Sequence, residues 1–408
     1  QMAARGDLPA ALRHCRVQKC AACLFGKARR RAWRTKAPVN KIKTPPVTAP
    51  GSVVAIDQMI SALPGFIAQM RGFITRKRYK VITVFVDQYS DLSFVYTQKS
   101  TTAEETVQAK EAFERYAKTH GVTVRHYHAD NGIFAEAEFL RAVEKNGQSI
   151  SFCGVNAHHM NGHAEKRIRD LQENARAMLL HAKRRWPTAV STHLWPYAVR
   201  MANEVHNFSP SIKDAISPIE KFSQVQVSPR VKHCHTFGCP VYVLDGKLQV
   251  GKGVPKWDDR ARIGLFLGFS PRHGRKVALV LNLTTGHVSP QFHVVFDDLF
   301  DTLRPSAGNA FPKSLWQQKA GFVLEDGTPV LPKKKDKKEP TADKGLEPSS
   351  IPGELQTDET HQETGVDESF EQGEDIALPP QEDDMMNVLE PETANEIAST
   401  TPLRSTRS

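Results

Sequence analysis

Cysteine is scarce in this sequence, with six residues in 408. So few thiols in a chain of this length do not form the disulfide framework of a small secreted domain, and we expect a reducing compartment. Long hydrophobic runs are also missing. None reaches the roughly 18 residues that span a bilayer, and no charged-then-apolar signal segment opens the chain, so no membrane partner is expected. Because the first residue is Gln1 rather than Met, we expect a piece of a longer protein.

Acidic residues are few in most of the chain and concentrated near its end. Residues 1–339 contain 52 Lys and Arg against 28 Asp and Glu, whereas residues 340–408 contain 3 against 17. A basic excess of that size fits a nucleic acid partner, because each phosphate neutralised by Lys or Arg releases a counterion. A basic but merely solvated surface is the alternative from charge by itself. We expect residues 306–408, rich in Pro, Glu, Asp, Ser and Thr, to be a disordered acidic linker.

Hydrophobic patterning divides the remainder into three parts. Residues 1–45 form a small module with a basic arm, and residues 46–225 alternate strand patterns with helical ones. The predicted strands lie at 53–57, 79–87, 92–97, 122–128 and 149–153, and the predicted helices at 101–119, 135–146, 163–185 and 189–206. We therefore predict a mixed α/β domain. Residues 226–305 contain strand patterns only, with a Thr285-Gly286 turn, and predict a small antiparallel β-barrel.

Three acidic residues stand out by their positions in this pattern. Asp57 ends the first predicted strand, Asp130 follows the fourth in "HADNG", and Glu165 begins the long helix in "NGHAEKRIRD". Phosphoryl transfer without a covalent enzyme intermediate uses two divalent ions about 4 Å apart, and Mg²⁺ prefers carboxylate oxygens. Strand ends and a helix start are rigid enough for such a site. Taken singly, each acid could equally be a cap or turn residue.

Neighbouring polar residues are interpreted as structural. Asp87 and Asp91 flank a turn and are read as turn residues, and Asn131 with Gly132 as residues that shape the loop after Asp130. Five histidines gather around the proposed site, but none is assigned a proton-transfer role: His126, His128, His158, His159 and His163. The thiols of Cys153, Cys234 and Cys239 lie in apolar strand contexts and are expected to fill the core.

Several stretches together resemble the integrase region of copia-type LTR-retrotransposon polyproteins over about residues 15 to 300. They are "VVAIDQM", "ITVFVDQYS", "HADNG", "FCGVNAHHMNGHAEKRIRDLQENARAMLLHA", "LWPYAVRMANEVHN" and "HTFGCPVYVLD". The resemblance implies an RNase H-like core with Asp57, Asp130 and Glu165 as its metal-holding acids, followed by an SH3-like β domain. The spacing from Asp130 to Glu165 is about one residue shorter than is usual in that family, which a loop can absorb.

The paired cysteines Cys20 and Cys23 have the two-residue gap of a zinc knuckle. In the family that the sequence resembles, two histidines precede such a pair, and here that segment would precede Gln1. Either His14 and Cys15 complete a zinc site locally, or the two thiols carry no metal. Residues 1–45 are therefore interpreted as a truncated zinc-binding pre-integrase module with a basic arm.

DNA contacts are predicted from two groups of cations. One is the arm that contains Arg29, Arg30 and Arg31, and the other surrounds Glu165 on the long helix: Lys166, Arg167, Arg169 and Arg176. For both groups, a solvated charged surface is the alternative. On the same helix, Ile168, Leu171, Met178 and Leu179 have helical spacing and predict a face packed on the sheet.

The resulting hypothesis is a retrotransposon integrase that uses Mg²⁺ or Mn²⁺ to process DNA 3′ ends and transfer them into target DNA. Its partners would be element ends, target DNA and further copies of the chain. Its site of action would be the nucleus after a cytoplasmic particle stage, and "KKKDKK" at 333–338 resembles a nuclear localisation signal. Two alternatives stay open: an inactive nucleic-acid-binding remnant, and an RNase H-type nuclease of the same fold.

Overall fold

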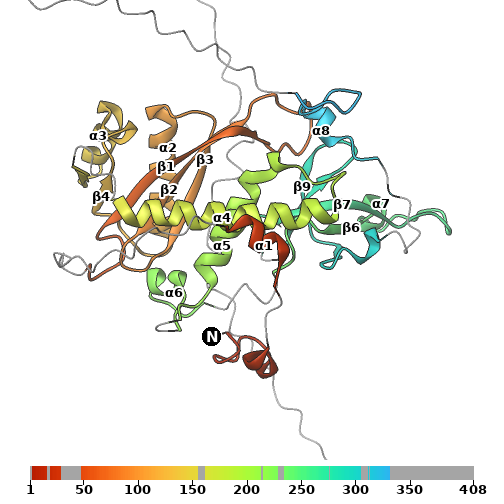
Figure 1. Cartoon of the computed structure of the whole chain (residues 1–408), viewed down its shortest axis with the longest axis horizontal. Coiled ribbons are helices and arrows are strands. Elements are labelled where there is room, and N and C mark those ends of the chain that lie inside the picture. The colour runs from red at the N-terminus through yellow and green to blue at the C-terminus, as the bar shows by residue number, and fades with distance from the viewer. Residues whose placement is uncertain are drawn as a thin grey trace, which may run out of the picture.

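The structure is a computed structural model, and it describes residues 2–15, 19–28, 47–154, 161–212, 215–227, 234–274, 276–304, 311 and 313–330. Two β-sheets lie at opposite ends of the molecule, and a long helix runs between them (Figure 1). Predictions that concern Arg29, Arg30, Arg31, His158, His159 and the 333–338 motif lie outside the described residues. None of the helices in the described ranges has the length and apolar content that a bilayer crossing requires.

The first sheet has the strand order β3-β2-β1-β4-β5. Its first three strands are antiparallel, whereas β4 is parallel to β1 and β5 is parallel to β4. The strands are β1 (Val54–Gly65), β2 (Tyr79–Asp87), β3 (Ser93–Gln98), β4 (His126–Ala129) and β5 (Ser149–Phe152). The predicted fold class is confirmed as a mixed α/β sheet with flanking helices.

Helices cover both faces of this sheet. On one face, α2 (Ala103–Thr119) and α3 (Ala137–Lys145) enclose a core with Val54, Ile56, Tyr127 and Ala129. On the other, α4 (Gly162–Arg185) and α5 (Trp195–Phe208) pack on Ala55 and Met59. In α4 the predicted apolar stripe is confirmed, because Leu171 and Leu179 are buried while Ile168 and Met178 pack against the same core.

The second sheet has the order β10-β6-β7-β8-β9, and all its pairings are antiparallel. Its strands are β6 (Pro240–Leu244), β7 (Ala261–Phe269), β8 (Ala278–Asn282), β9 (Val288–Gln291) and β10 (Val294–Phe296). Gly286 occupies the predicted turn between β8 and β9 with a φ of 79°, a conformation that favours glycine. Apolar residues of this sheet belong to the same buried cluster as α4 and α5, so one core joins the two sheets.

Several element boundaries differ from the prediction. The strand expected at 53–57 continues to Gly65, so Asp57 lies inside β1 rather than at its end. The strand expected at 122–128 begins only at His126, and the helix expected at 189–206 begins at Trp195, after a short 3₁₀ turn. Pattern does not locate such boundaries, because a strand continues for as long as its neighbour supplies hydrogen bonds.

The expectation of a disordered linker from residue 306 is wrong for residues 313–330. The α8 helix (Trp316–Lys319) buries Trp316 completely, and its indole Nε1 donates a hydrogen bond to the carbonyl of Ala189 at 2.7 Å. The Trp316 ring meets Phe66 edge to face with 5.3 Å between centroids. A short apolar stretch within a polar region was enough to dock, because the core already offered a partner surface.

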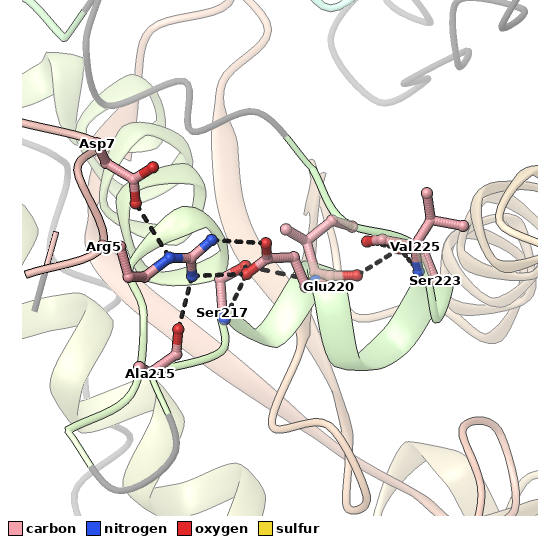
Figure 2. Close-up of polar contacts among 8 residues, drawn as sticks. Arg5, Asp7, Ala215, Ser217, Glu220, Ser223 and Val225 are labelled. Atoms are coloured by element: carbon pink, nitrogen blue, oxygen red, sulfur yellow. Dashed lines mark hydrogen bonds and ion pairs between the residues drawn. The ribbon is translucent and has the colours of Figure 1, made fainter.

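The amino-terminal segment is fixed to the short helix α6 (Pro218–Ser223) by Arg5, as Figure 2 shows. The Arg5 guanidinium donates two hydrogen bonds to the Glu220 carboxylate, at 3.0 and 2.8 Å, and one to the carbonyl of Ala215. Glu220 also accepts hydrogen bonds from the backbone N–H and hydroxyl of Ser217, in a capping box. This clamp holds the pKa of Glu220 at about 2, mainly because of Arg5.

Candidate active site

Asp57 and Asp130 lie beside each other because of the strand register. In the parallel pairing of β1 with β4, Val54 is opposite Tyr127 and Ala55 is opposite His128. Asp57 is three residues beyond Val54, and Asp130 is three residues beyond Tyr127, so both acids occupy the same level of adjacent strands. Both are half-buried. The sequence placed each acid on its strand, but only this register makes them neighbours.

The two acids also share a face of the sheet. Successive side chains of a strand point to opposite faces. Ile56 and Ala129, the residues just before the acids, pack in the core under α2 and α3. Asp57 and Asp130 therefore point to the opposite face, on the side of α4.

The beginning of α4 is attached to β1 next to Asp57. Asn161, the N-cap residue of α4, is buried and donates a hydrogen bond from its amide nitrogen to the carbonyl of Ile56 at 2.9 Å. Glu165 follows Asn161 by four positions, so it lies on the same side of the helix, one turn further on. Between them, Ala164 is fully buried in the core. The third acid is thus directed to the edge where Asp57 stands.

The buried thiol of Cys153 lies next to the segment that contains Asp130. Cys153 follows β5 directly, its backbone N–H donates to the carbonyl of Ala129 at 2.9 Å, and its carbonyl accepts from the amide of Asn131 at 3.2 Å. Burial raises the pKa of this thiol most. The negative charges of Asp130, Glu165 and Asp57 raise it further, in that order. The thiol is therefore within electrostatic range of all three carboxylates.

Sequence reasoning had assigned Cys153 to the core only. A signal for its position existed, because Cys153 follows its strand just as Asp130 follows the neighbouring strand.

From Cys153, a series of hydrogen-bonded polar side chains runs along β4 and β5. The His128 ring lies 3.7 Å from the Cys153 sulfur, and Ser151 bridges the rings of His128 and His126 at 2.9 and 2.8 Å.

The loop that follows Asp130 has the structural role predicted for it. The Asp130 carboxylate accepts a hydrogen bond from the backbone N–H of Gly132 at 3.3 Å, and Asn131 reaches the neighbouring strand. A methyl group built on Gly132 would lie 3.4 Å from the Asp130 oxygen. That is an ordinary contact distance, so the loop lies against the carboxylate without requiring glycine at this position.

The chemistry of these donors fits a hard divalent cation, because carboxylate oxygens are the ligands that Mg²⁺ and Mn²⁺ prefer. Asn161 Oδ1, buried at the same edge, has no hydrogen-bond partner among the described residues and adds an oxygen of the same kind. Across the described ranges, however, no three His, Cys, Asp or Glu side chains are already close enough to grip one ion. Asp57, Asp130 and Glu165 therefore do not form a ready metal-binding group among the described residues.

The cations around Glu165 divide into two kinds. Lys166 and Arg169 are exposed. Arg167 is buried, forms an ion pair with Asp91 at 2.8 Å and donates to the Nδ1 of His206 at 3.0 Å. Arg167 therefore joins α4 to α5 and to the β2–β3 turn. The prediction that Arg167 contacts DNA is corrected accordingly.

Arg176 also has a structural contact. It donates a hydrogen bond to the carbonyl of Gly26 at 3.0 Å, at the end of the short helix α1 (Ala21–Gly26). That helix approaches α4 closely, since a methyl group on Gly26 would lie 3.0 Å from the Ala177 backbone. Arg176 thus attaches the amino-terminal module to α4 and, unlike Lys166 and Arg169, already has a defined use.

The turn interpretation of Asp87 is confirmed. Its carboxylate is buried and accepts hydrogen bonds from the backbone N–H groups of Gly51 and Ser90 and from the Ser90 hydroxyl. Burial raises the pKa of Asp87, and these hydrogen bonds counteract part of that rise. Asp91 has a positive φ of 64° and pairs with Arg167, so it too belongs to the turn.

No protein-family model matches the sequence. Solved structures with a similar arrangement include the HTLV-2 integrase catalytic core domain in complex with magnesium, with 18% identity and a TM-score of 0.31 over 43% of this chain and 97% of that chain. A simian T-cell lymphotropic virus intasome aligns with 16% identity and a TM-score of 0.35, over 68% of this chain and 87% of that chain. The catalytic core domain of BIV integrase aligns with 17% identity and a TM-score of 0.31, over 45% of this chain and 99% of that chain. Likenesses this weak leave the role of the three acids to the geometry of this chain.

Cys20 and Cys23 lie at the beginning of α1. Within the described residues, no third His, Cys, Asp or Glu joins them in a group that could hold a metal ion. His14 and Cys15, which are both described, therefore do not complete the zinc site that the sequence suggested. The contact between α1 and α4 positions the helix that bears the paired thiols.

Proposed function

We propose that this chain is a polynucleotidyl transferase of the integrase type, which processes DNA 3′ ends and joins them to target DNA. One observation carries the proposal: the β1–β4 register sets Asp57 beside Asp130, and Asn161 ties the start of the Glu165-bearing helix to Ile56. Three half-exposed carboxylates from two adjacent strands and one helix suit the binding of divalent ions for phosphoryl transfer.

Asp57, Asp130 and Glu165 would hold the ions, Mg²⁺ or Mn²⁺. When bound, such ions polarise a phosphodiester and lower the pKa of the attacking hydroxyl group. The two strands hold Asp57 and Asp130 rigidly, and Asn161 fixes the helix that bears Glu165.

In the first reaction, a water oxygen attacks a phosphodiester near the 3′ end of the DNA, forming a P–O bond as the P–O3′ bond breaks. The retained strand then ends in a free 3′-hydroxyl, and the short released fragment carries the 5′-phosphate. In the second, that hydroxyl oxygen attacks a phosphodiester of the target, one P–O bond forms, and one P–O bond of the target breaks. No net bond energy is required, so the chain supplies mainly position and charge. Lys166 and Arg169, exposed beside Glu165, would contact the phosphates of the DNA end.

The finer assignments are also proposals. We propose a copia-type retrotransposon origin, an SH3-like character for the second sheet, assembly of several copies around two DNA ends, and action in the nucleus. The second sheet supports its part of this proposal, since its five antiparallel strands are short and follow the core in sequence. Size-exclusion chromatography with and without paired DNA ends would test assembly.

The activity can be tested with a labelled duplex that carries the element's terminal sequence, a plasmid target, and Mg²⁺ or Mn²⁺. We expect trimmed and joined products from the full chain. Asp57→Asn, Asp130→Asn and Glu165→Gln should each abolish both products, whereas Asp259→Asn, an exposed acid in the second sheet's longest loop, should retain them. Cleavage of an RNA:DNA hybrid without joining would instead identify a nuclease, and binding without either reaction would identify an inactive remnant.

A further inference from the structure

The loop that joins β1 to β2 combines an exposed aromatic ring with dense positive charge. Phe73 is 98% exposed, whereas most phenylalanine side chains in folded proteins are buried. Residues 61–80 contain five Lys and Arg and no Asp or Glu. Among them, Arg76 and Lys77 are exposed close to Phe73 in sequence.

The exposure of Phe73 does not come from a poorly anchored loop. Gln69 accepts a hydrogen bond from the Thr75 backbone through its side chain and another from Val288 of β9 through its carbonyl, the latter at 2.9 Å. The carbonyl of Gly72, next to Phe73, lies 2.9 Å from the His287 ring nitrogen and accepts its hydrogen bond. The second sheet therefore holds both sides of the loop tip.

The base of the loop is held by Arg78. Its guanidinium donates hydrogen bonds to the carbonyls of Thr75 and Lys77, both at 2.7 Å, and to the carbonyl of Ala320. It also lies over the Phe322 ring, 4.4 Å from the centroid. Figure 1 shows the chain leaving β1 beside α8. Arg78 is thus a structural cation, and the neighbouring Arg76 and Lys77 remain at the surface.

The surroundings of the loop are basic as well. A groove separates it from the turn between β7 and β8, and Met70, Arg272 and His273 contribute to the lining. The described residues of that turn and of the strands behind it, 270–274 and 276–291, contain two cations, Arg272 and Lys276, and no acid. The adjoining residues 313–330 contain two basic and two acidic side chains. The loop and the strands next to it therefore form a surface with an excess of positive charge.

We propose that this loop binds unpaired DNA, with Phe73 stacked on one base and Arg76 and Lys77 in contact with the flanking phosphates. Cations suit a phosphate backbone, and an aromatic face accepts any base that is not enclosed in a duplex. A membrane fits less well, because one ring stands at the tip while Ile74 packs against Gly286.

This surface goes beyond the proposed reaction, because it lies far from the acids. Asp57 is opposite Val84 and Gly65 is opposite Tyr79, so the end of β1 lies five β2 residues, about 17 Å, from Asp57, and the loop continues beyond it. A DNA strand could therefore contact the loop while another part of it occupies the acid site. Binding at the loop requires no metal ion.

The test uses the full chain, EDTA, and a short fluorescent single-stranded oligonucleotide, with anisotropy as the readout. Phe73→Ala should weaken single-strand binding about tenfold, the loss expected for one stacked base. The same variant should bind the matching duplex almost as the unaltered chain does. Phe292→Ala, which removes a ring that is 61% exposed elsewhere on the second sheet, should leave both affinities unchanged.

Two further variants separate stacking from simple apolar contact. Phe73→Trp should retain binding, whereas Phe73→Leu should be as weak as Phe73→Ala. Lys77→Ala should reduce the slope of log affinity against log salt by about 0.7, the value for one single-strand phosphate contact.

The inference would be overturned if Phe73→Ala bound the single strand with unchanged affinity, or if Phe73→Leu bound it fully. It would also be overturned if Phe73→Ala lost binding to phosphatidylserine vesicles but kept its affinity for the single strand. Because EDTA removes metal-dependent chemistry from the assay, failure of the proposed integrase reaction would not affect these outcomes.

Discussion

The Cys153 thiol reports the charge state of its surroundings, since its pKa is raised by burial and by three carboxylates. Replacing any of these acids by its amide removes a negative charge that disfavours the thiolate, so the pKa of Cys153 should fall. We expect the largest fall for Asp130→Asn, then Glu165→Gln, then Asp57→Asn. Alkylation of Cys153 as a function of pH, quantified by mass spectrometry, measures this order. Asp259→Asn is the control, and an unchanged pKa in Glu165→Gln would remove Glu165 from the site.

Arg167 and Arg169 lie two positions apart on α4 but have different environments. Arg167→Ala should lower the free energy of unfolding by about 2 kcal/mol, because hydrogen bonds of a charged group to His206 and Asp91 are lost. Arg169→Ala, at an exposed position, should change it by less than about 0.5 kcal/mol. Urea unfolding measures both values. Equal stability of the two variants, with weaker DNA binding by Arg167→Ala, would restore the original DNA-contact prediction.

At the scale of elements, the clamp between Arg5 and α6 links stability to pH. The pKa of Glu220 is lowered from 4.5 to about 2, so the clamp contributes stability above pH 4.5 and loses it as pH falls toward 2. Arg5→Met removes the main cause of that shift and should flatten the decrease in stability over this range. Arg13→Met, which removes contacts to backbone carbonyls only, is the control. Thermal unfolding at several pH values gives the comparison, and parallel curves for Arg5→Met and the unaltered chain would contradict it.

Elements differed in how well their sequence specified them. The α2 helix begins one residue after Thr102, whose hydroxyl caps the helix by accepting from Glu105, and its extent was predicted closely. The β2 strand matches its prediction because its apolar run ends at the turn residue Asp87. The extension of β1 to Gly65 was missed, since it depends on pairing with β2 and not on its own pattern.

At the scale of the molecule, one buried cluster joins the two sheets through α4, α5 and Trp316. Trp316→Ala should therefore lower the free energy of unfolding by about 3–5 kcal/mol, the usual cost of removing a fully buried large side chain. Trp257→Ala, at a ring that is 90% exposed, should change it little.

Unfolding in urea, followed by intrinsic fluorescence and by circular dichroism, measures this difference. We expect coincident transitions for the unaltered chain, because the two sheets share their core. Separate transitions for the two sheets would show that the shared cluster contributes little to cohesion.

The sequence by itself determined features that depend on a few neighbouring residues: strand alternation, helix caps, the Gly286 turn, and the placement of each acid beside a strand or helix start. Tertiary structure decided what distant residues do together. Asn161 reaches Ile56 across 105 positions, and Trp316 reaches Ala189 across 127. The register of paired strands, the face to which a side chain points and the docking of distant segments all depend on mutual burial and on paired hydrogen bonds. No local sequence pattern encodes which distant segment provides these contacts. For that reason the three acids were visible in the sequence, whereas the register that sets Asp57 beside Asp130 was not.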